Sequence, residues 1–360
     1  KNKRYPVDCF RRRFTVNGIK KARLYITACG LYEAQLNGVR VGDFILAPGI
    51  TDYKRRIQYQ TYDVTALLKN GQNSLCVQLA DGWFRGSTGA WGLKNQYGTQ
   101  TKLLAQLELS QEDGTEQTII SDESWEWSND GPIRFADNKD GEVVEAWRVP
   151  GYGGRARKAR CSVTPTASDN VPVTEHERFS PRLLHTPSGK KVLDFGQNIA
   201  GYVRFSITAK AGQTLFLRFG ELLDDAGEFT QKNIQCSNRK VTTPLQQVRY
   251  LCRDGVNDYK TTFAIFGFQY VLVETGIALE PKDFEAIAVY SDMDQAAQFE
   301  SSNALLDQFV KTRCGAQKTT LPTCLQTVPP ASVTAGPATR RFFAARPVIC
   351  WTICLLHANT

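Results

Sequence analysis

The stretch LYEAQLNGVRVGDFILAPGITDYKRRIQYQTY, Leu31–Tyr62, decides the fold of the first part of the chain. Side chains alternate from Leu31 to Leu36, which predicts a half-buried strand. Asn37-Gly38 follows, and this pair accepts the two positive φ angles of a type I′ hairpin turn. Alternation then resumes, and Pro48-Gly49 predicts a second turn before a third strand. The stretch is therefore predicted to be a self-contained antiparallel β unit.

Length and composition indicate an ordinary globular protein. At 360 residues the chain should hold about two domains. Hydrophobic residues make up 42% and charged residues 22%. No apolar run reaches the length of about 18 residues that a membrane span needs, so no membrane partner is predicted. Residues 1–13 lack the apolar core of a signal peptide, which favours a cytoplasmic location, although the chain does not begin with Met.

Charge and cysteine content exclude further classes. The formal net charge is +8, but the basic residues are scattered apart from 11–13 and 155–160, which are interpreted as solvated strand ends or linkers. No nucleic-acid partner is therefore predicted. The ten cysteines contain no CxxC pair and are spaced irregularly, which favours mostly reduced, buried thiols. The three histidines lack ligand spacing, so no zinc site is predicted.

Changes in pattern divide the chain into segments. Short alternating strands with turns every eight to twelve residues predict two antiparallel β-sandwiches. Helical spacing begins near Ser302, after a Ser-Ser-Asn cap, and predicts the start of an α-helical domain. Asp63–Leu68 predicts one short helical turn, and Asp81–Gly86 a loop. The predicted segments are 1–150 for the first sandwich, 151–182 for a linker, 183–292 for the second sandwich, 293–318 for the first helix and 319–360 for an irregular tail.

Several motifs resemble one known family. FRRRFTV, GLYEAQLNGVRVGD, LAPGITDYKRRIQYQTYDVTALL and DGWFRG resemble the N-terminal sandwich of bacterial α-L-rhamnosidases, glycoside hydrolase family 78. LDFGQNIAGYVRF, AGQTLFLRFGELLDDAGEF and FAIFGFQYVLVETG are similar to the concanavalin-like sandwich of the same enzymes. The resemblance covers Phe10–Asp307, apart from Phe266 where a His is usual and Gln269 where an Arg is usual. It implies that both sandwiches precede a catalytic (α/α)6 barrel, which opens with the helix near Ser302.

The tail departs from this plan. The 53 residues after Asp307 contain no Asp or Glu, where about five are due at the chain's rate of 36 in 360. The family's barrel opens with a sequence similar to NFxDxPTDCPxRERxGWTGDAQxF, whose first Asp after Pro-Thr the resemblance implies to be the general acid. In the alternative reading frame, each codon consists of the third base of one residue's codon and the first two bases of the next residue's codon. Suitable codon choices for Thr319–Phe343 then permit the sequence NFADLPTDCPTRERHGWTGDAQIF. We therefore predict a frameshift and a truncated gene product; the alternative is a disordered or atypical terminus.

Catalysis is not expected of this sequence alone. An inverting glycosidase needs one carboxylic acid to protonate the leaving oxygen and a second carboxylate to activate water, about 6.5–9.5 Å apart. The resemblance places both groups in the barrel. The chain is therefore predicted to carry the accessory sandwiches of an α-L-rhamnosidase, without catalytic residues, required cofactors or rhamnoside hydrolysis of its own.

Carbohydrate binding is the activity that the sandwiches could keep. Sugars stack on aromatic rings beside paired polar groups. Six residues are the candidates, and they are Asp81, Trp83, Arg85, Asn129, Asp130 and Glu142. For Trp83 the alternative is a core or interdomain plug, and for Glu142 it is structural capping. The resemblance also implies calcium held by Asp and Asn oxygens, ligands that suit this ion.

Two functions thus stand open from the sequence. The first is a fragment of an α-L-rhamnosidase, the enzyme that hydrolyses terminal α-L-rhamnose from rhamnosides. The second is a stand-alone carbohydrate-binding protein made of the same sandwiches, with rhamnose as its ligand. Both imply rhamnose-containing glycosides or polysaccharides as partners.

Overall fold

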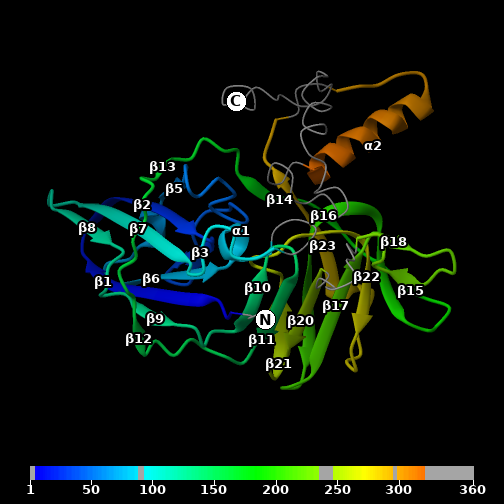
Figure 1. The fold of residues 1–360 in the computed structure, drawn as a ribbon, viewed down its shortest axis with the longest axis horizontal. Coiled ribbons are helices and arrows are strands. Elements are labelled where there is room, and N and C mark those ends of the chain that lie inside the picture. The colour runs from blue at the N-terminus through cyan, green and yellow to red at the C-terminus, as the bar shows by residue number, and fades with distance from the viewer. Residues whose placement is uncertain (1–4, 88–92, 235–245, 295–297, 321–360) are drawn as a thin grey trace.

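The computed structural model describes residues 5–87, 93–234, 246–294 and 298–320. Over these residues β-strands gather into two bodies that lie side by side, and one long helix stands beyond the second body (Figure 1). The predicted mainly β fold is confirmed. The predicted frameshifted tail is 319–360; its first two residues end the long helix, and residues 321–360 lie outside the described residues.

The first sandwich consists of a six-stranded sheet, in the order β12-β9-β1-β6-β3-β4, and a five-stranded sheet, in the order β13-β5-β2-β7-β8. Leu24 of β2 and Leu75 of β6 are each 1% exposed and belong to the core that the sheets share. Burying a side chain of this size stabilises the fold by about 1.5–3 kcal/mol. The strands are β1 (Asp8–Val16), β2 (Ile19–Cys29), β3 (Leu31–Leu36), β4 (Val39–Arg40), β5 (Gln58–Asp63), β6 (Gly71–Ala80), β7 (Lys102–Gln111), β8 (Glu116–Ile120), β9 (Glu126–Ser128), β12 (Gly154–Arg155) and β13 (Thr166–Ala167).

The stretch Leu31–Tyr62 contributes to both sheets. Asn37 and Gly38 have φ angles of 53° and 84°, as the predicted hairpin turn requires, and join β3 to β4. The third strand, β5, pairs with β2 in the opposite sheet rather than with β4. The stretch is therefore not a self-contained unit. Residues 41–57 carry the chain from one layer to the other, and alternation within a strand does not encode such a crossing.

The second sandwich is a ten-stranded sheet that folds on itself. Strands follow the order β10-β11-β20-β17-β22-β16-β23-β14, and β15 and β21 both pair with β16. The pairing of β16 with β22 shifts register between Asp194 and Ile199, and the later part of β16 pairs with β23 and β21. The strands are β10 (Ile133–Asp137), β11 (Gly141–Glu145), β14 (Val173–Phe179), β15 (Arg182–His185), β16 (Lys191–Ala209), β17 (Thr214–Gly220), β20 (Gln247–Leu251), β21 (Gly255–Tyr259), β22 (Phe266–Glu274) and β23 (Phe284–Ser291), with a small ribbon of β18 (Leu222–Leu223) and β19 (Phe229–Thr230).

The boundary between the sandwiches differs from the predicted division. Strands β10 and β11 fall inside the range 1–150, yet β11 pairs in parallel with β20 of the second sheet. Gly141 permits this pairing, because its φ is +112° and an added Cβ would lie 1.8 Å from the Gln247 carbonyl oxygen. The range 151–182, predicted as a linker, supplies β12 and β13 to the first sandwich and β14 to the second. Which strands pair with each other depends on segments far apart in the sequence, and the local residue pattern does not show this.

The helical elements are short except for one. They are η1 (Thr65–Leu67), α1 (Gly82–Arg85), η2 (Pro281–Asp283) and α2 (Ala304–Thr320). The turn η1 and the helix α2 match the sequence predictions, whereas α1 lies where a loop was predicted. Asn303 caps α2, since its side-chain oxygen accepts the Leu305 backbone N–H at 3.0 Å. Among the described residues, neither α-helix combines the length and the apolar character that crossing a bilayer demands.

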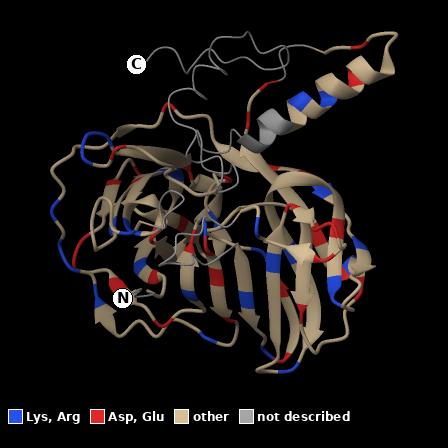
Figure 2. Cartoon of the chain, turned by 45° about the vertical axis from the view of Figure 1, so that its right-hand side comes forward, with Lys and Arg blue, Asp and Glu red and all other residues tan. Residues whose placement is uncertain are grey.

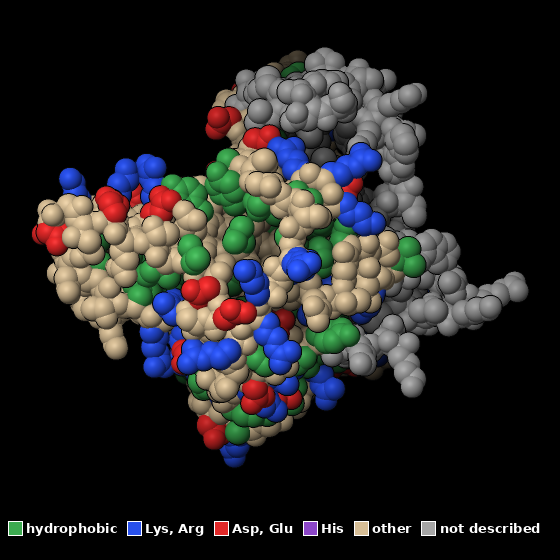
Figure 3. Space-filling model, turned by 60° about the vertical axis from the view of Figure 1, so that its left-hand side comes forward, with side chains coloured by type: hydrophobic (Ala, Val, Ile, Leu, Met, Phe, Trp, Pro, Cys, Tyr) green, Lys and Arg blue, Asp and Glu red, His purple; other side chains and the backbone are tan. Residues whose placement is uncertain are grey.

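Helix α2 projects from the second sandwich (Figure 2). Its Val310 and Cys314 pack against Ala288 and Tyr290. In the visible face of the space-filling view, basic and acidic side chains are interspersed (Figure 3).

Candidate functional site

The first group of predicted site residues lies around α1, directly after β6. Gly82 has a φ of +51°, and an added Cβ would lie 2.6 Å from Leu31 Cγ, so only glycine permits this turn. The Arg85 guanidinium donates from Nε to Asp81 Oδ1 at 2.7 Å and lies 4.4 Å from the centre of the Tyr5 ring. Burial raises the pKa of Asp81, and the Arg85 charge opposes this rise. Asp81 and Arg85 are each 7% exposed, so their charges satisfy each other.

Trp83 is internal. Its side chain is 2% exposed and belongs to the core of the first sandwich. The neighbouring Phe84 ring packs edge-on against Tyr53 at 5.3 Å, and Tyr53 packs against Tyr97 at 5.1 Å. An indole in this position has no free face on which a sugar could stack. The position matches the alternative interpretation of Trp83 as a core residue.

Two buried carboxylates, Asp137 and Asp140, lie against the segment that follows α1. Ser87 donates its backbone N–H to Asp137 Oδ2 at 2.7 Å and its hydroxyl to Asp140 Oδ2 at 3.0 Å. Burial, and then the charge of Asp137, raise the pKa of Asp140 to about 7. The remaining Oδ1 of Asp140 and Oδ1 of Asn138 are buried and accept no hydrogen bond. Sequence analysis did not single out this cluster as a site.

These oxygens do not complete a calcium site. Calcium takes about six to eight oxygen ligands, and Asp140 Oδ1 and Asn138 Oδ1 are of the right chemical type. However, the described residues contain no group of three or more His, Cys, Asp or Glu side chains arranged to hold a metal ion. The fit is therefore partial, and calcium binding stays a prediction.

Glu142 connects β11 to the segment after β21. It is 1% exposed, and Oε1 accepts the backbone N–H groups of Thr262 at 3.0 Å and Phe263 at 2.6 Å. The Tyr259 hydroxyl donates to Oε2. Burial raises the pKa of Glu142 to about 7, against the opposing effect of these three donors. The geometry is that of structural capping, because each donor belongs to the protein.

Asn129 and Asp130 lie at the protein surface after β9. Arg148 Nη1 lies 2.6 Å from Asp130 Oδ1, and Arg134 Nη1 lies 3.4 Å from the same atom. Arg134 also donates to the Asn129 carbonyl oxygen at 2.9 Å. The structure thus brings Asp81, Trp83 and Arg85 onto one turn, and leaves Asn129, Asp130 and Glu142 in two other environments. As a carbohydrate site, the set of six stays a prediction.

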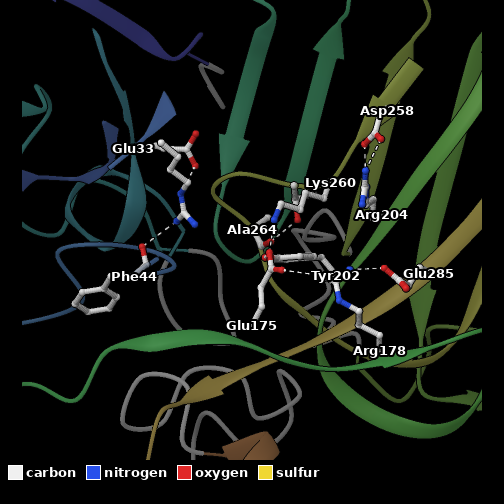
Figure 4. A network of polar contacts seen from close by, with 12 residues as sticks. Glu33, Phe44, Glu175, Arg178, Tyr202, Arg204, Asp258, Lys260, Ala264 and Glu285 are labelled. Carbon is white, nitrogen blue, oxygen red and sulfur yellow. Dashed lines mark hydrogen bonds and ion pairs between the residues drawn. The ribbon is translucent and has the colours of Figure 1, made fainter. Parts of the chain in front are cut away.

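A polar network lies where the two sandwiches meet (Figure 4). On the second sandwich, Glu175 Oε1 accepts the Tyr202 hydroxyl at 2.6 Å and pairs with Lys260. On the first, Arg40 Nε lies 3.2 Å from Glu33 Oε2. Hydrogen bonding to Lys260 and Tyr202 outweighs burial and lowers the pKa of Glu175. These residues come from strands far apart in the sequence, so no spacing rule could have predicted the network.

A cavity of about 570 Å³ lies between the second sandwich and α2. Glu177, Asn198 and Tyr290 line its sandwich side, and Val310 and Cys314 line its helix side. The Tyr290 hydroxyl donates to both Glu177 oxygens, at 2.9 and 2.8 Å. Sequence analysis missed this cavity, since its lining depends on how α2 docks.

Comparisons with known proteins place this architecture. Residues 17–175 match the model of the α-L-rhamnosidase N-terminal domain, and residues 184–290 match that of the bacterial α-L-rhamnosidase concanavalin-like domain. An α-L-rhamnosidase of Streptomyces avermitilis is 39% identical over 276 residues, which are 73% of this chain and 26% of that protein. One from Formosa agariphila is 30% identical over 310 residues, 81% of this chain and 32% of that protein.

Solved structures agree. The S. avermitilis α-L-rhamnosidase complexed with L-rhamnose superposes with a TM-score of 0.81 at 33% identity, over 91% of this chain and 32% of that chain. The native Aspergillus terreus enzyme gives 0.79 at 31% identity, over 90% of this chain and 39% of that chain. The chain therefore spans between a quarter and two fifths of the length of these relatives.

Proposed function

The chain belongs to the bacterial α-L-rhamnosidase family, and we propose that it supplies the two accessory β-sandwiches of an enzyme that hydrolyses terminal α-L-rhamnose from rhamnosides. The observation that carries this proposal is the presence of both family domains in order, at residues 17–175 and 184–290. The partners that follow from it are rhamnose-containing glycosides or polysaccharides.

The carboxylates of the sandwiches support an accessory role. An inverting hydrolase needs two acids that face an open site with room for substrate and water. Glu142 is taken up by three protein donors, and Asp81 by Arg85. Asp224 accepts the backbone N–H groups of Ala226 and Glu228 in a turn. Each of these acids performs a structural task, so the sandwiches are proposed to support catalysis by another domain.

The stand-alone binding protein is not favoured. The relatives are named as α-L-rhamnosidases, and the matched segments are only 26% and 32% of their length. The aromatic side chain offered for sugar stacking, Trp83, is buried.

A direct assay tests the accessory role. The purified chain is incubated with an aryl α-L-rhamnoside, and release of the aryl group is followed. No turnover is expected, because Asp81, Glu142 and Asp224 are each held by donors of the protein itself. Turnover that survives repurification would overturn the proposal. A thermal melt with L-rhamnose, and with D-mannose as the control sugar, checks the second function, since a stabilisation specific to rhamnose would favour a binding protein.

A chimera tests membership of the enzyme. Residues 5–290 of this chain replace the matching segment of the S. avermitilis relative. We expect the chimera to hydrolyse the aryl α-L-rhamnoside, because the two folds superpose closely. A soluble, folded chimera without activity would argue against the proposed role.

A further inference from the structure

The two basic runs of the sequence lie together in the folded chain. Residues 11–13 belong to β1, residues 155–160 begin on β12, and β9 lies between these two strands (Figure 1). Arg11 of β1 and Arg155 of β12 are both ladder partners of Glu126 on β9. Directly opposite residues project from the same face of a sheet, and so does Arg13, two residues after Arg11. Three arginines thus surround one carboxylate on the same face.

This face has an excess of positive charge. Glu126 Oε2 lies 2.6 Å from Arg11 Nε and 3.9 Å from Arg13 Nε, so two guanidiniums share one carboxylate. Arg155 Nη1 donates to the Ser124 carbonyl oxygen at 2.8 Å, which holds this side chain without neutralising its charge. The Arg13 side chain is 57% exposed, and Arg155 is exposed as well. Both can therefore reach a ligand in solution.

The segment after β12 continues the positive charge along the edge of the sandwich. Ala156 donates its backbone N–H to the Trp125 carbonyl oxygen at 2.9 Å, and Lys102 donates to the Arg160 carbonyl oxygen at 2.7 Å, so both ends of the segment are anchored. Four exposed cations of residues 155–160 form no ion pair with a described carboxylate, and they are Arg155, Arg157, Lys158 and Arg160. Together with Arg11 and Arg13 they make up what we term the basic surface.

We propose that the basic surface binds the carboxylate groups of an acidic polysaccharide, a glycan chain that carries uronic acids. This inference rests on the proposed function, from which rhamnose-containing polysaccharides follow as partners. Five of the six cations are arginines, whose planar guanidiniums donate in a fork that matches a carboxylate. Because β1 and β12 are two strands apart, the Cα atoms of Arg11 and Arg155 are about 10 Å apart. That spread suits successive acid groups of a polymer better than one small anion.

Nucleic acid suits the basic surface less well. Single strands bind by stacking their bases on aromatic rings, but the Tyr152 ring beside Arg11 is covered by the guanidinium, whose carbon lies 3.9 Å from the ring centre. The major groove of duplex DNA admits a helix or a two-stranded ribbon, whereas Arg11, Glu126 and Arg155 form a row across three strands. The geometry therefore favours the glycan.

Titration calorimetry of the full chain with polygalacturonate tests the proposal. The methyl ester of the same polymer, which carries no charge, is the control ligand. We expect binding of polygalacturonate alone, and weaker binding as salt screens the charges. The double variant Arg13→Ala/Arg155→Ala should weaken binding about tenfold or more, because it removes two charged donors.

A matched variant separates the basic surface from net charge. Arg55→Ala/Lys282→Ala removes the same two charges from side chains that are 87% and 77% exposed and lie outside this surface. It should change the affinity less than about twofold, and both double variants should keep the circular dichroism of the wild type.

Four outcomes would overturn the proposal. They are no binding of polygalacturonate, equal binding of its methyl ester, equal weakening by the two double variants, and double-stranded DNA that displaces polygalacturonate at an equal concentration of charge. Polygalacturonate contains no rhamnose and the assay involves no turnover. Failure here would therefore leave the proposed function standing, and that function is tested separately by the aryl α-L-rhamnoside and the chimera.

Discussion

Replacing Glu142 by glutamine should change how the stability of the chain depends on pH. Glu142 is buried and accepts three hydrogen bonds, and its pKa is raised from 4.5 to about 7. Between these values the folded chain keeps a proton on Glu142 that the unfolded chain releases. The free energy of unfolding therefore falls as pH rises through this window, by about 3 kcal/mol at about 1.4 kcal/mol per pKa unit.

Glu142→Gln has nearly the same shape and carries no charge. At about pH 4 it should match the protonated wild type within about 1 kcal/mol, since the amide can still accept from Thr262 and Phe263 and donate to Tyr259. By about pH 8 the variant should be more stable than the wild type by roughly 3 kcal/mol, because only the wild type then buries a charge. Asp140 also titrates near neutral pH, but it is present in both proteins and cancels in the difference.

Urea unfolding followed by tryptophan fluorescence at several pH values measures this difference. Glu123→Gln, at an exposed position, is the matched control and should give a difference that does not change with pH. The reasoning is refuted if the difference for Glu142→Gln is equally flat, since the carboxyl would then titrate as it does in water.

Three further predictions follow from the described contacts. Arg85→Ala removes the cation beside Asp81, whose side chain is only 9% exposed, and should lower the free energy of unfolding in urea by about 3–5 kcal/mol. The control Arg55→Ala, at a side chain that is 87% exposed, should change it by at most about 1 kcal/mol. Equal effects of the two substitutions would contradict the burial argument. Gly141→Ala places a Cβ 1.8 Å from a backbone carbonyl oxygen of β20 and should abolish the cooperative thermal transition, while Gly151→Ala, with no atom within 4 Å, should leave it unchanged. Sequencing the gene across codons 319–343 should reveal NFADLPTDCPTRERHGWTGDAQIF in the alternative phase, and any other reading there would reject the frameshift.

Local signals in the sequence were sufficient for several elements. Asn37-Gly38 predicts the hairpin of β3 and β4, because few residue pairs tolerate two positive φ angles. Asn303 predicts the start of α2, because its short side chain reaches the free N–H groups of the first turn. Order and motifs also identified both sandwiches, which the family models confirm.

Burial and partner choice were harder to predict. Trp83 and Glu142 are residue types that also occur in sugar sites, and only the packed structure shows that one lies in the core and the other is saturated by protein donors. Irregular spacing favoured reduced thiols, and it carried no information about which cysteines are neighbours.

The parallel pairing of β11 with β20 has a consequence for the history of such proteins. Because β11 pairs with β20, which lies about a hundred residues later in the sequence, the second sandwich without the hairpin of β10 and β11 would expose the unpaired edge of Gln247–Leu251. A gene rearrangement that transferred only the second sandwich would leave its sheet without β10 and β11. We therefore expect the two sandwiches to be inherited together, and one buried cluster that contains Leu24 of the first and Tyr202 of the second agrees with this.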